Sequence, residues 1–346
     1  MHGLGGDCGD AQRGARGTRR RARRLTLAWS AFVPDLCEEL TAYRPDRAAA
    51  VAFGVFDGVH LGHRHVLATL VGAAKQRGLA PVAVTLANHP FSVLRPDVEL
   101  RMLTSLEERL DLLADSGVAA VVPVTFTKQV SLLTPREFMT ALRDCLGMAY
   151  FAAGPDVTLG HNREGTLPVL EALGEELGYT MECVEQLSLG GEPARSTAIR
   201  QALDAGDVAR AARMLGRPFA LEGPVVEGEH RGGGLLGYPT ANVGVGPQQA
   251  VPADGIYAGW LLHGTDRLPA AVSIGHKPTF HEDGPSVVEA FVLDFDGNLY
   301  GEQVKLEFVE RLRGQEKFDG ADALIAAMRD DVTRTRRILA LSKEAS

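Results

Sequence analysis

Two histidines, separated by a leucine and a glycine, stand where an apolar run gives way to a predicted helix. They close the stretch GVFDGVHLGH at 54–63, whose chemically informative residues are Gly54, Phe56, Asp57, Gly58, His60 and His63. Glycines let the backbone approach a ligand, and the unpaired N–H groups of a helix start attract an anion. Imidazole donors beside them stabilise charge that builds on phosphate oxygens. The stretch predicts a phosphate site, although an isolated H-x-G-H is as readily an ordinary helix cap.

A second polar cluster, RSTAIR at 195–200, opens another predicted helix. The hydroxyls of Ser196 and Thr197 and the guanidinium of Arg200 suit a polyphosphate. Taken alone, such a hexapeptide is more often a helix N-cap with solvated arginines. Both clusters fall in the same predicted domain, which favours one shared nucleotide site.

The C-terminal third has no G-x-x-x-x-G-K-[ST] motif, so phosphoryl transfer there needs different machinery. Residues 228–237 supply five glycines together with Arg231, and Thr240 and Asn242 follow. A flexible backbone near Arg231 can wrap phosphates. The Thr240 hydroxyl and the Asn242 carboxamide can hold a Mg²⁺ that bridges nucleotide oxygens. We expect an ATP site at this loop.

Phosphoryl transfer also needs a group that accepts the proton of the acceptor hydroxyl. Glu289 is the candidate base, because it lies in the apolar strand pattern VVEAFVL at 287–293. The alternative is an outward-facing residue of an alternating strand, which is the commoner case without further context.

The N-terminal half alternates between short apolar runs and helical periods. Strands are expected at 48–56, 81–86, 119–124 and 149–153, and helices at 63–77, 106–115 and 135–146. This order predicts a parallel, doubly wound α/β sheet.

After residue 213 the sequence pattern changes to short runs rich in β-forming residues, separated by glycine and proline. Strands are expected at 219–227, 257–263, 270–274, 287–295 and 304–308, a density that predicts a small antiparallel barrel. A final amphipathic helix at about 321–340 would pack Leu324, Met328 and Ile338 against the barrel.

Composition limits the class of protein. A chain of 346 residues with 45% hydrophobic and 23% charged residues is long enough for two ordinary domains and typical of soluble globular proteins. The net charge of -8 opposes broad attraction to nucleic acid. No apolar run reaches the length of a membrane span. We expect a cytoplasmic protein without nucleic-acid or membrane partners.

The first 45 residues form a Gly- and Arg-rich opening with a basic cluster at 19–24 and no hydrophobic periodicity. We interpret it as a disordered extension; a targeting peptide would need an apolar core segment and a cleavage site. The four cysteines, Cys8, Cys37, Cys145 and Cys183, lie far apart, so we expect reduced thiols, with Cys145 and Cys183 packed.

Together these motifs resemble the nucleotidyltransferase superfamily. In their residue sequence they resemble the prokaryotic bifunctional riboflavin kinase/FMN adenylyltransferase (FAD synthetase) family. The resemblance runs from about residue 48 to 340. Its further pieces are the segments at 85–90, 154–165, 237–242, 254–257, 274–280 and 299–301. It implies a Rossmann-like nucleotidyltransferase domain at 46–205 and a β-barrel riboflavin kinase domain with a C-terminal helix at 206–346, after the extension at 1–45.

The resemblance also implies roles for the candidate residues. The histidines and the Ser-Thr-x-x-Arg element hold ATP while the FMN phosphate attacks the α-phosphorus, and Asp156 falls where the family places a polar residue of this site. Thr240 and Asn242 hold Mg²⁺ and ATP phosphates, and Glu289 activates the ribityl hydroxyl of riboflavin. FMN then passes between the sites through solvent or between the protomers of a homo-oligomer.

Three positions depart from the family pattern. Thr-Phe-x-Pro-His-Pro stands here as TLANHP at 85–90, with Leu86 and Asn88 at the changed positions, and Arg195 replaces a small serine. One alternative is therefore a kinase paralogue whose adenylylation is altered or lost. Another is a flavin-binding regulator without turnover, which would have no need of a base.

Overall fold

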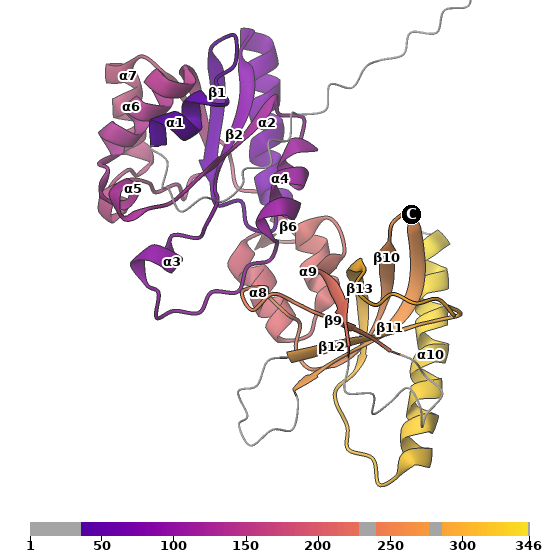
Figure 1. The fold of residues 1–346 in the computed structure, drawn as a ribbon. Helices are drawn as coiled ribbons and strands as arrows, with labels where there is room; N and C mark the ends of the chain where they lie inside the picture. The colour runs from indigo at the N-terminus through magenta and orange to yellow at the C-terminus, as the bar shows by residue number, and fades with distance from the viewer. Residues whose placement is uncertain (1–35, 228–239, 277–285, 345–346) are drawn as a thin grey trace, which may run out of the picture. The chain divides into compact units, whose positions relative to one another are not determined.

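The computed structural model describes residues 36–227, 240–276 and 286–344. Its N-terminal part is a five-stranded parallel sheet in the order β3-β2-β1-β4-β5 (Figure 1). The strands are β1 Ala49–Gly54, β2 Ala80–Leu86, β3 Ala120–Val124, β4 Met148–Ala153 and β5 Thr180–Cys183. The parallel, doubly wound sheet predicted from the sequence is confirmed.

Helices cover both faces of this sheet, because successive residues of a strand point to opposite sides. Val51 and Phe151 belong to a core under α1, α6 and α7, whereas Ala50 and Tyr150 belong to a core under α2 and α4. The helices are α1 Leu36–Thr41, α2 Leu61–Arg77, α3 Phe91–Leu94, α4 Leu106–Ala114, α5 Lys128–Leu132, α6 Pro135–Leu146 and α7 Leu167–Leu177.

Local signals set the ends of these helices. Helix α6 begins with a capping box between Thr134 and Glu137 and ends at Gly147, which adopts a φ of 77°. Helix α2 begins two residues before the predicted start, because the side chain of His60 accepts the backbone N–H of His63. Strand β5 was not predicted; none of its residues is buried, so no apolar run marks it.

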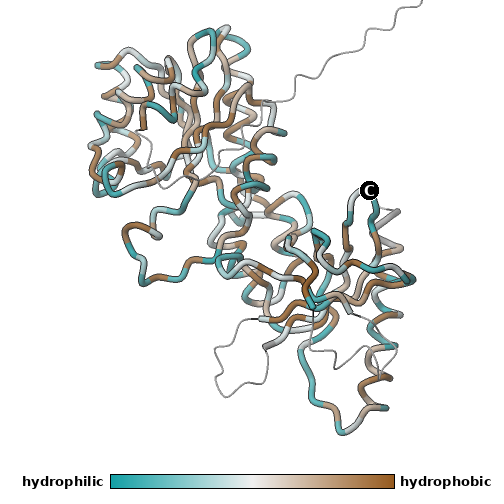
Figure 2. The backbone as a smooth tube through the Cα atoms, in the orientation of Figure 1, coloured by the Kyte–Doolittle hydropathy of each residue, from teal (hydrophilic) through white to brown (hydrophobic). Residues whose placement is uncertain are grey.

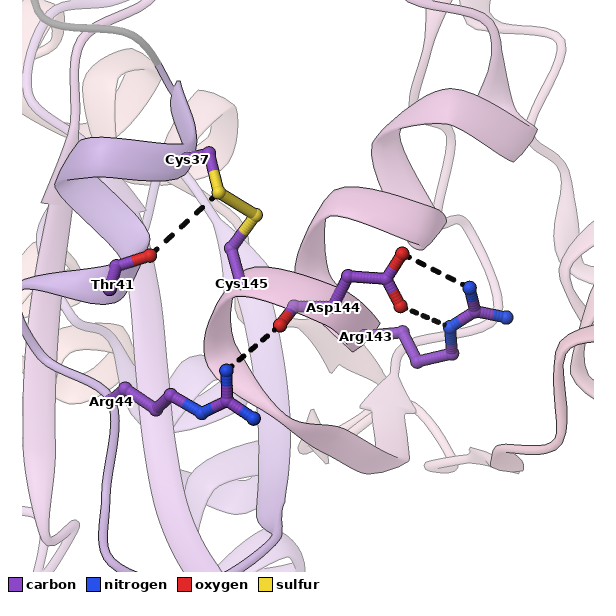
Figure 3. The surroundings of a disulfide bond; sticks show 6 residues. All are labelled: Cys37, Thr41, Arg44, Arg143, Asp144 and Cys145. Carbon is purple, nitrogen blue, oxygen red and sulfur yellow. Dashed lines mark hydrogen bonds and ion pairs between the residues drawn. A yellow bond between two sulfur atoms is a disulfide. The ribbon is translucent and has the colours of Figure 1, made fainter.

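Helix α1 lies within the predicted extension and packs Leu36 and Leu40 against the core beneath α6. Cys37 on α1 and Cys145 on α6 form a disulfide across a sequence separation of 108 residues, with Cα atoms 5.5 Å apart (Figure 3). The Arg44 guanidinium ties the same segments by donating to the Asp144 carbonyl at 3.1 Å.

The expectation of reduced thiols is therefore wrong for Cys37 and Cys145, because helix packing brings distant cysteines together in a way that sequence spacing does not reveal. Cys183 is a free thiol, but it is exposed rather than packed. Cys8 lies outside the described residues.

The C-terminal part is a closed antiparallel barrel in the order β10-β11-β12-β9-β8-β13, with β13 pairing back to β10 (Figure 1). Its strands are β8 Phe219–Val226, β9 Ala241–Val243, β10 Gly255–His263, β11 Asp266–His276, β12 Ser286–Val292 and β13 Gln303–Arg313. The predicted barrel is confirmed. Strand β9 escaped prediction because three residues are too few to show a periodic pattern.

Two helices, α8 Ser196–Asp204 and α9 Val208–Leu215, share a hydrophobic core with the barrel through Ile199 and Met214. A short hairpin of β6 Ser188–Leu189 and β7 Glu192–Pro193 precedes α8.

Helix α10, Ala321–Glu344, alternates hydrophobic and hydrophilic segments (Figure 2) and packs Ile338 and Leu339 near Trp260 of the barrel. Leu324 and Met328, which were also predicted to pack against the barrel, are only partly buried. Of the helices in the described ranges, none combines the length and apolar content needed to cross a membrane.

Candidate active sites

A cavity of about 450 Å³ lies beyond the carboxyl ends of β1 and β4. The strand order reverses here, with β2 on one side of β1 and β4 on the other. Open α/β sheets bind ligands at such a switch point. The walls come from the β1–α2 loop, residues 154–157 after β4, residues 184–187 after β5 and the start of α8. Most of the predicted N-terminal site residues therefore surround a single cavity.

His60 and His63 line this cavity and stack, with ring centroids 3.6 Å apart and ring planes inclined by 19°. The Nδ1 atom of His60 accepts the backbone N–H of His63 at 3.3 Å. Because Nδ1 is an acceptor, the proton of the neutral His60 ring resides on Nε2, which can donate to a ligand. The ring of Phe56 meets His63 edge-on at 5.2 Å and holds its orientation.

Both imidazoles are held in their neutral form. Burial lowers the pKa of His60 to about 4, and the positive charge of Arg217 contributes. The pKa of His63 lies well below its ordinary value through burial, His60 and Arg109, in that order. Nδ1 of His63 is buried and has no hydrogen-bond partner within the described part of the chain. At neutral pH the pair therefore offers hydrogen bonds to a phosphate and not positive charge.

The loop before α2 has an unusual backbone. Phe56, Gly58 and Val59 adopt φ values of 52°, 80° and 38°. A side chain at position 58 would come within 2.9 Å of Leu103, so this left-handed turn requires glycine. Strained non-glycine residues such as Phe56 and Val59 persist where surrounding contacts enforce them, and they cluster at ligand sites.

Asp57 anchors this loop and does not line the cavity. Its side chain is buried and accepts the backbone N–H groups of Leu103 at 3.0 Å and Thr104 at 3.3 Å. Arg200 forms an ion pair with the same carboxylate. Burial raises the pKa of Asp57, and Arg200 and the two N–H groups oppose that rise. The loop is thereby fixed from beneath.

The start of α8 docks on the same loop. Ser196 Oγ donates to the Asp57 carbonyl at 2.9 Å, and Arg200 Nε donates to the Arg101 carbonyl at 2.7 Å. A Cβ atom on Gly62 would come within 3.0 Å of the Ala194 carbonyl oxygen, so the approach is close. Ser196 lines the cavity, as does Thr197, whereas Arg200 is engaged with Asp57 and does not.

Arg195 and Asp156 both line the cavity and form an ion pair, with Arg195 Nη2 and Asp156 Oδ2 3.5 Å apart. The same guanidinium donates to Gln186 Oε1 at 3.2 Å. The arginine that departs from the family pattern therefore places a half-exposed cation at the cavity, partly balanced by Asp156.

Three residues of the second predicted site lie on or beside the barrel. Strand β12 places Glu289 opposite Asn242 of β9, and opposed residues of antiparallel strands share a face. Val288 and Ala290 are buried in the barrel core, so Glu289 and Asn242 belong to the outer face. Thr240 precedes Asn242 by two residues. Arg231 and the glycine-rich loop lie outside the described residues.

Comparison with known proteins identifies the family. The FAD synthetase model matches residues 43–198, and the riboflavin kinase model matches residues 215–339. The bifunctional riboflavin kinase/FMN adenylyltransferase of Bacillus subtilis is 34% identical over 287 residues, covering 82% of this chain and 90% of that protein. The protein of the same description from Escherichia coli K12 is 33% identical over 303 residues, covering 87% and 96%. The chain belongs to this bifunctional family.

A solved structure described as a macrolide-efflux protein from Streptococcus pneumoniae has a similar fold. It aligns with a TM-score of 0.78 and 30% identity, covering 86% of this chain and 97% of its own. The two-part architecture described above is thus shared over almost the whole of that chain.

Two arginines that the sequence analysis did not single out contact the loops around this cavity. Arg109 of α4 is only 1% exposed; its Nη2 donates to the carbonyls of Leu86 at 2.8 Å and Ala87 at 3.2 Å. Arg217 Nη1 donates to the Gly58 carbonyl at 2.9 Å. Each resembles an ordinary surface arginine in the sequence, and only tertiary packing reveals these contacts.

Proposed function

We propose that this chain phosphorylates riboflavin to FMN at the barrel and adenylylates FMN to FAD at the switch-point cavity, using one ATP at each site. The observation that supports this most directly is the stacked His60–His63 pair, because both residues line a cavity at the end of β1 and β4. The two family models cover the corresponding regions in the same order.

For adenylylation, an oxygen of the FMN phosphate attacks the α-phosphorus of ATP, and the bond to the β-phosphate breaks to release pyrophosphate. Charge grows on the pyrophosphate oxygens as this bond breaks. Neutral His60 and His63, together with the hydroxyl of Thr197, donate hydrogen bonds to those oxygens. The hydroxyl of Ser196 lines the same cavity and holds the start of α8 on the Asp57 carbonyl. Gly54, Phe56 and Asp156 shape the pocket, and Asp57, Gly58 and Arg200 hold the loop in place.

For riboflavin phosphorylation, Glu289 accepts the proton of the ribityl hydroxyl. The oxygen of that hydroxyl attacks the γ-phosphorus of ATP, and ADP leaves. Thr240 and Asn242 present hydroxyl and amide oxygens, which fit Mg²⁺ because this ion prefers hard oxygen ligands and takes few from protein. When bound, Mg²⁺ neutralises charge on the phosphates, at this site and at the cavity. Arg231 would contact ATP phosphates.

We place the adenylyltransferase domain at 46–205 and the riboflavin kinase domain at 206–346. Of the predicted extension at 1–45, α1 packs on the sheet and belongs with the adenylyltransferase domain. The acidic balance of the chain, with a net charge of -8, supports small-molecule ligands and no nucleic-acid partner. We further propose a cytoplasmic enzyme that meets its flavins in solution, either as a monomer or as a homo-oligomer.

A second candidate function is a riboflavin kinase whose adenylylation is altered, favoured by Arg195 at the cavity and by Asn88 in the changed segment. Full-length protein incubated with FMN, ATP and Mg²⁺ separates the two. Formation of FAD and pyrophosphate supports the bifunctional enzyme. Absence of FAD, with FMN still formed from riboflavin, supports the altered kinase.

The same flavin separation tests the assignment of the base. Glu289→Gln should abolish FMN formation from riboflavin but leave the adenylylation of added FMN intact. Glu310→Gln, which changes an exposed carboxylate on the same barrel, is the matched control and should retain both activities. Unchanged riboflavin phosphorylation in Glu289→Gln would show that another group accepts the proton.

A further inference from the structure

The loop that follows β2 is fixed by a side chain. Asn88 Oδ1 accepts the backbone N–H of Phe126 at 2.8 Å, and Asn88 Nδ2 donates to the Phe126 carbonyl at 3.0 Å. The last backbone bond between the two segments runs from Ala87 N to the Val124 carbonyl at 2.8 Å. The Asn88 carboxamide therefore extends the pairing of β2 and β3 beyond the point where the strands end.

The anchor of this clamp is itself held. Glu39 of α1 accepts the backbone N–H of Thr125 at 3.0 Å and its hydroxyl at 2.7 Å, immediately before Phe126. On the other side of the loop, Arg109 holds the carbonyls of Leu86 and Ala87. Asn88 thus connects two segments that are each fixed by independent contacts.

The loop also holds His89 through local hydrogen bonds. The carbonyl of His89 accepts the backbone N–H of Ser92 at 2.9 Å, and its Nδ1 accepts the N–H of Phe91 at 3.1 Å. Burial lowers the pKa of His89 to about 4, and the positive charges of Arg200 and Arg109 contribute to this decrease. The end of β2 that precedes this loop is joined to the β1–α2 loop, because Thr85 Oγ1 donates to the Val55 carbonyl at 3.0 Å.

The position of this loop indicates which substrate it serves. The nucleotide cavity lies on the β4 side of β1, whereas β2 and β3 lie on the other side. An in-line displacement requires the attacking group to arrive opposite the leaving group. A loop at the ends of β2 and β3 is placed to receive the acceptor FMN while pyrophosphate leaves on the cavity side.

We infer that Asn88 is a positioning residue for FMN adenylylation, whose carboxamide clamps the loop at 87–90 onto Phe126 and so fixes His89 where the acceptor arrives. In the family pattern a proline occupies this position. A proline restricts its own backbone. Asn88 reaches the same end through two hydrogen bonds, so the departure at position 88 preserves the shape of the loop. The inference rests on the proposed adenylylation.

The test compares Asn88→Ala with Asn88→Pro in the full chain. Loss of the clamp in Asn88→Ala should raise the KM for FMN in adenylylation about tenfold, as expected when one or two net hydrogen bonds are lost. The KM for ATP and the riboflavin kinase rate should stay within twofold. Asn88→Pro should restore most of the FMN affinity. Asn298→Ala removes an asparagine contact with the Tyr300 backbone elsewhere and should change neither KM.

An unchanged KM for FMN in Asn88→Ala, or an equal rise in the KM values for FMN and ATP, would overturn the inference. Formation of FAD by the wild type in the same assay tests the proposed function separately. Binding of FMN, followed by quenching of its fluorescence, reports on the clamp even if the wild type forms no FAD. In that measurement weaker binding by Asn88→Ala supports the inference and equal binding contradicts it.

Discussion

At the level of single residues, the switch-point cavity is lined by two histidines whose lowered pKa values keep them neutral. The His60 Nδ1 atom caps α2, so a proton there would both break the cap and introduce charge beside Arg217. His63 stacks on His60 and is affected by Arg109. The hydrogen bond from the His63 N–H to His60 Nδ1 sets the tautomer of His60 and leaves its Nε2–H as a donor for phosphate.

This arrangement predicts a pH-dependent stability. The folded pKa of His60 is about 4, below its ordinary value of 6.5, so the unfolded chain binds more protons between these values. The free energy of unfolding should therefore fall as the pH drops from 6.5 toward 4, by about 2 kcal/mol for His60 alone between pH 7.5 and 5. Urea unfolding of the wild type and His60→Gln at both pH values measures it, since the variant should lack this share.

The control for that experiment is His65→Gln, which changes an exposed histidine on the same helix. It should show the wild-type dependence on pH. If His60→Gln also kept the full dependence, the protonation of His60 would not be linked to unfolding.

The Asp57–Arg200 pair predicts a second effect at this scale. Arg200 is 19% exposed and Asp57 is 4% exposed, so Asp57→Asn leaves a largely buried guanidinium without its counter-charge. We expect a loss of about 3 kcal/mol in unfolding free energy, with weaker adenylylation because the loop loses its anchor. Chemical denaturation measures the first effect and FAD formation the second.

Asp97→Asn provides the comparison for Asp57→Asn. The Arg95–Asp97 pair is open to solvent, with side chains 61% and 69% exposed, so the substitution should not change stability measurably. Equal destabilisation by the two substitutions would contradict the anchoring role of Asp57.

At the level of elements, α1 is stabilised by its contacts with the rest of the fold and not by its own length. It has only six residues, too few to be stable alone. Leu36 and Leu40 bury against the α6 side of the sheet, Glu39 binds the end of β3, and Cys37 links to α6. This short helix therefore supports the segment to which Asn88 is clamped.

Reduction of the disulfide should destabilise the chain. Closing a loop across 108 residues restricts the unfolded state, so we expect reductant to lower the unfolding free energy by about 2–4 kcal/mol. Urea unfolding with and without a phosphine reductant measures this, and thiol titration should show two additional thiols per chain after reduction.

Substitutions at the cysteines complete that experiment. Cys37→Ser should behave like the reduced protein and respond no further to reductant. Cys183→Ser, which changes the exposed free thiol, should keep the wild-type response. An unfolding midpoint that does not move with reductant would contradict a stabilising link between α1 and α6.

At the level of the whole molecule, two reactions occupy different types of structure. The proposed adenylyltransferase site lies at a helix start beyond the carboxyl ends of a parallel sheet, and the proposed kinase site lies on the outer face of a barrel. The two sites share no predicted catalytic residue. FMN is the product of the kinase reaction and the substrate of adenylylation, so its transfer from one site to the other can be tested by experiment.

Two single-site variants should complement each other in solution. With riboflavin, ATP and Mg²⁺, Glu289→Gln alone should form no FMN, and His63→Gln alone should accumulate FMN without FAD. Mixed, they should form FAD after a lag that lengthens on dilution, because free FMN must diffuse from one molecule to the other. Continuous flavin chromatography measures the lag. A mixture that forms no FAD would indicate transfer confined to a single molecule or assembly.

Much of this molecule was predictable from local sequence. The alternation of apolar runs and helical periods determined the parallel sheet, and closely spaced short strands determined the barrel, because these patterns follow directly from backbone geometry. The histidine pair and the Thr240–Asn242 segment were found because their residues are close in the chain. Strand β5, α7 and α1 carried weaker local patterns and were not predicted.

Only the tertiary structure decided which distant residues meet. It placed Arg109 under the end of β2, joined Asn88 to Phe126, bonded Cys37 to Cys145 and turned Arg200 toward Asp57. Local sequence determines which backbone conformations are favourable, and so it reveals elements and compact motifs. Contacts across tens of residues depend instead on how complete hydrophobic faces pack together, and no short stretch of sequence contains that information.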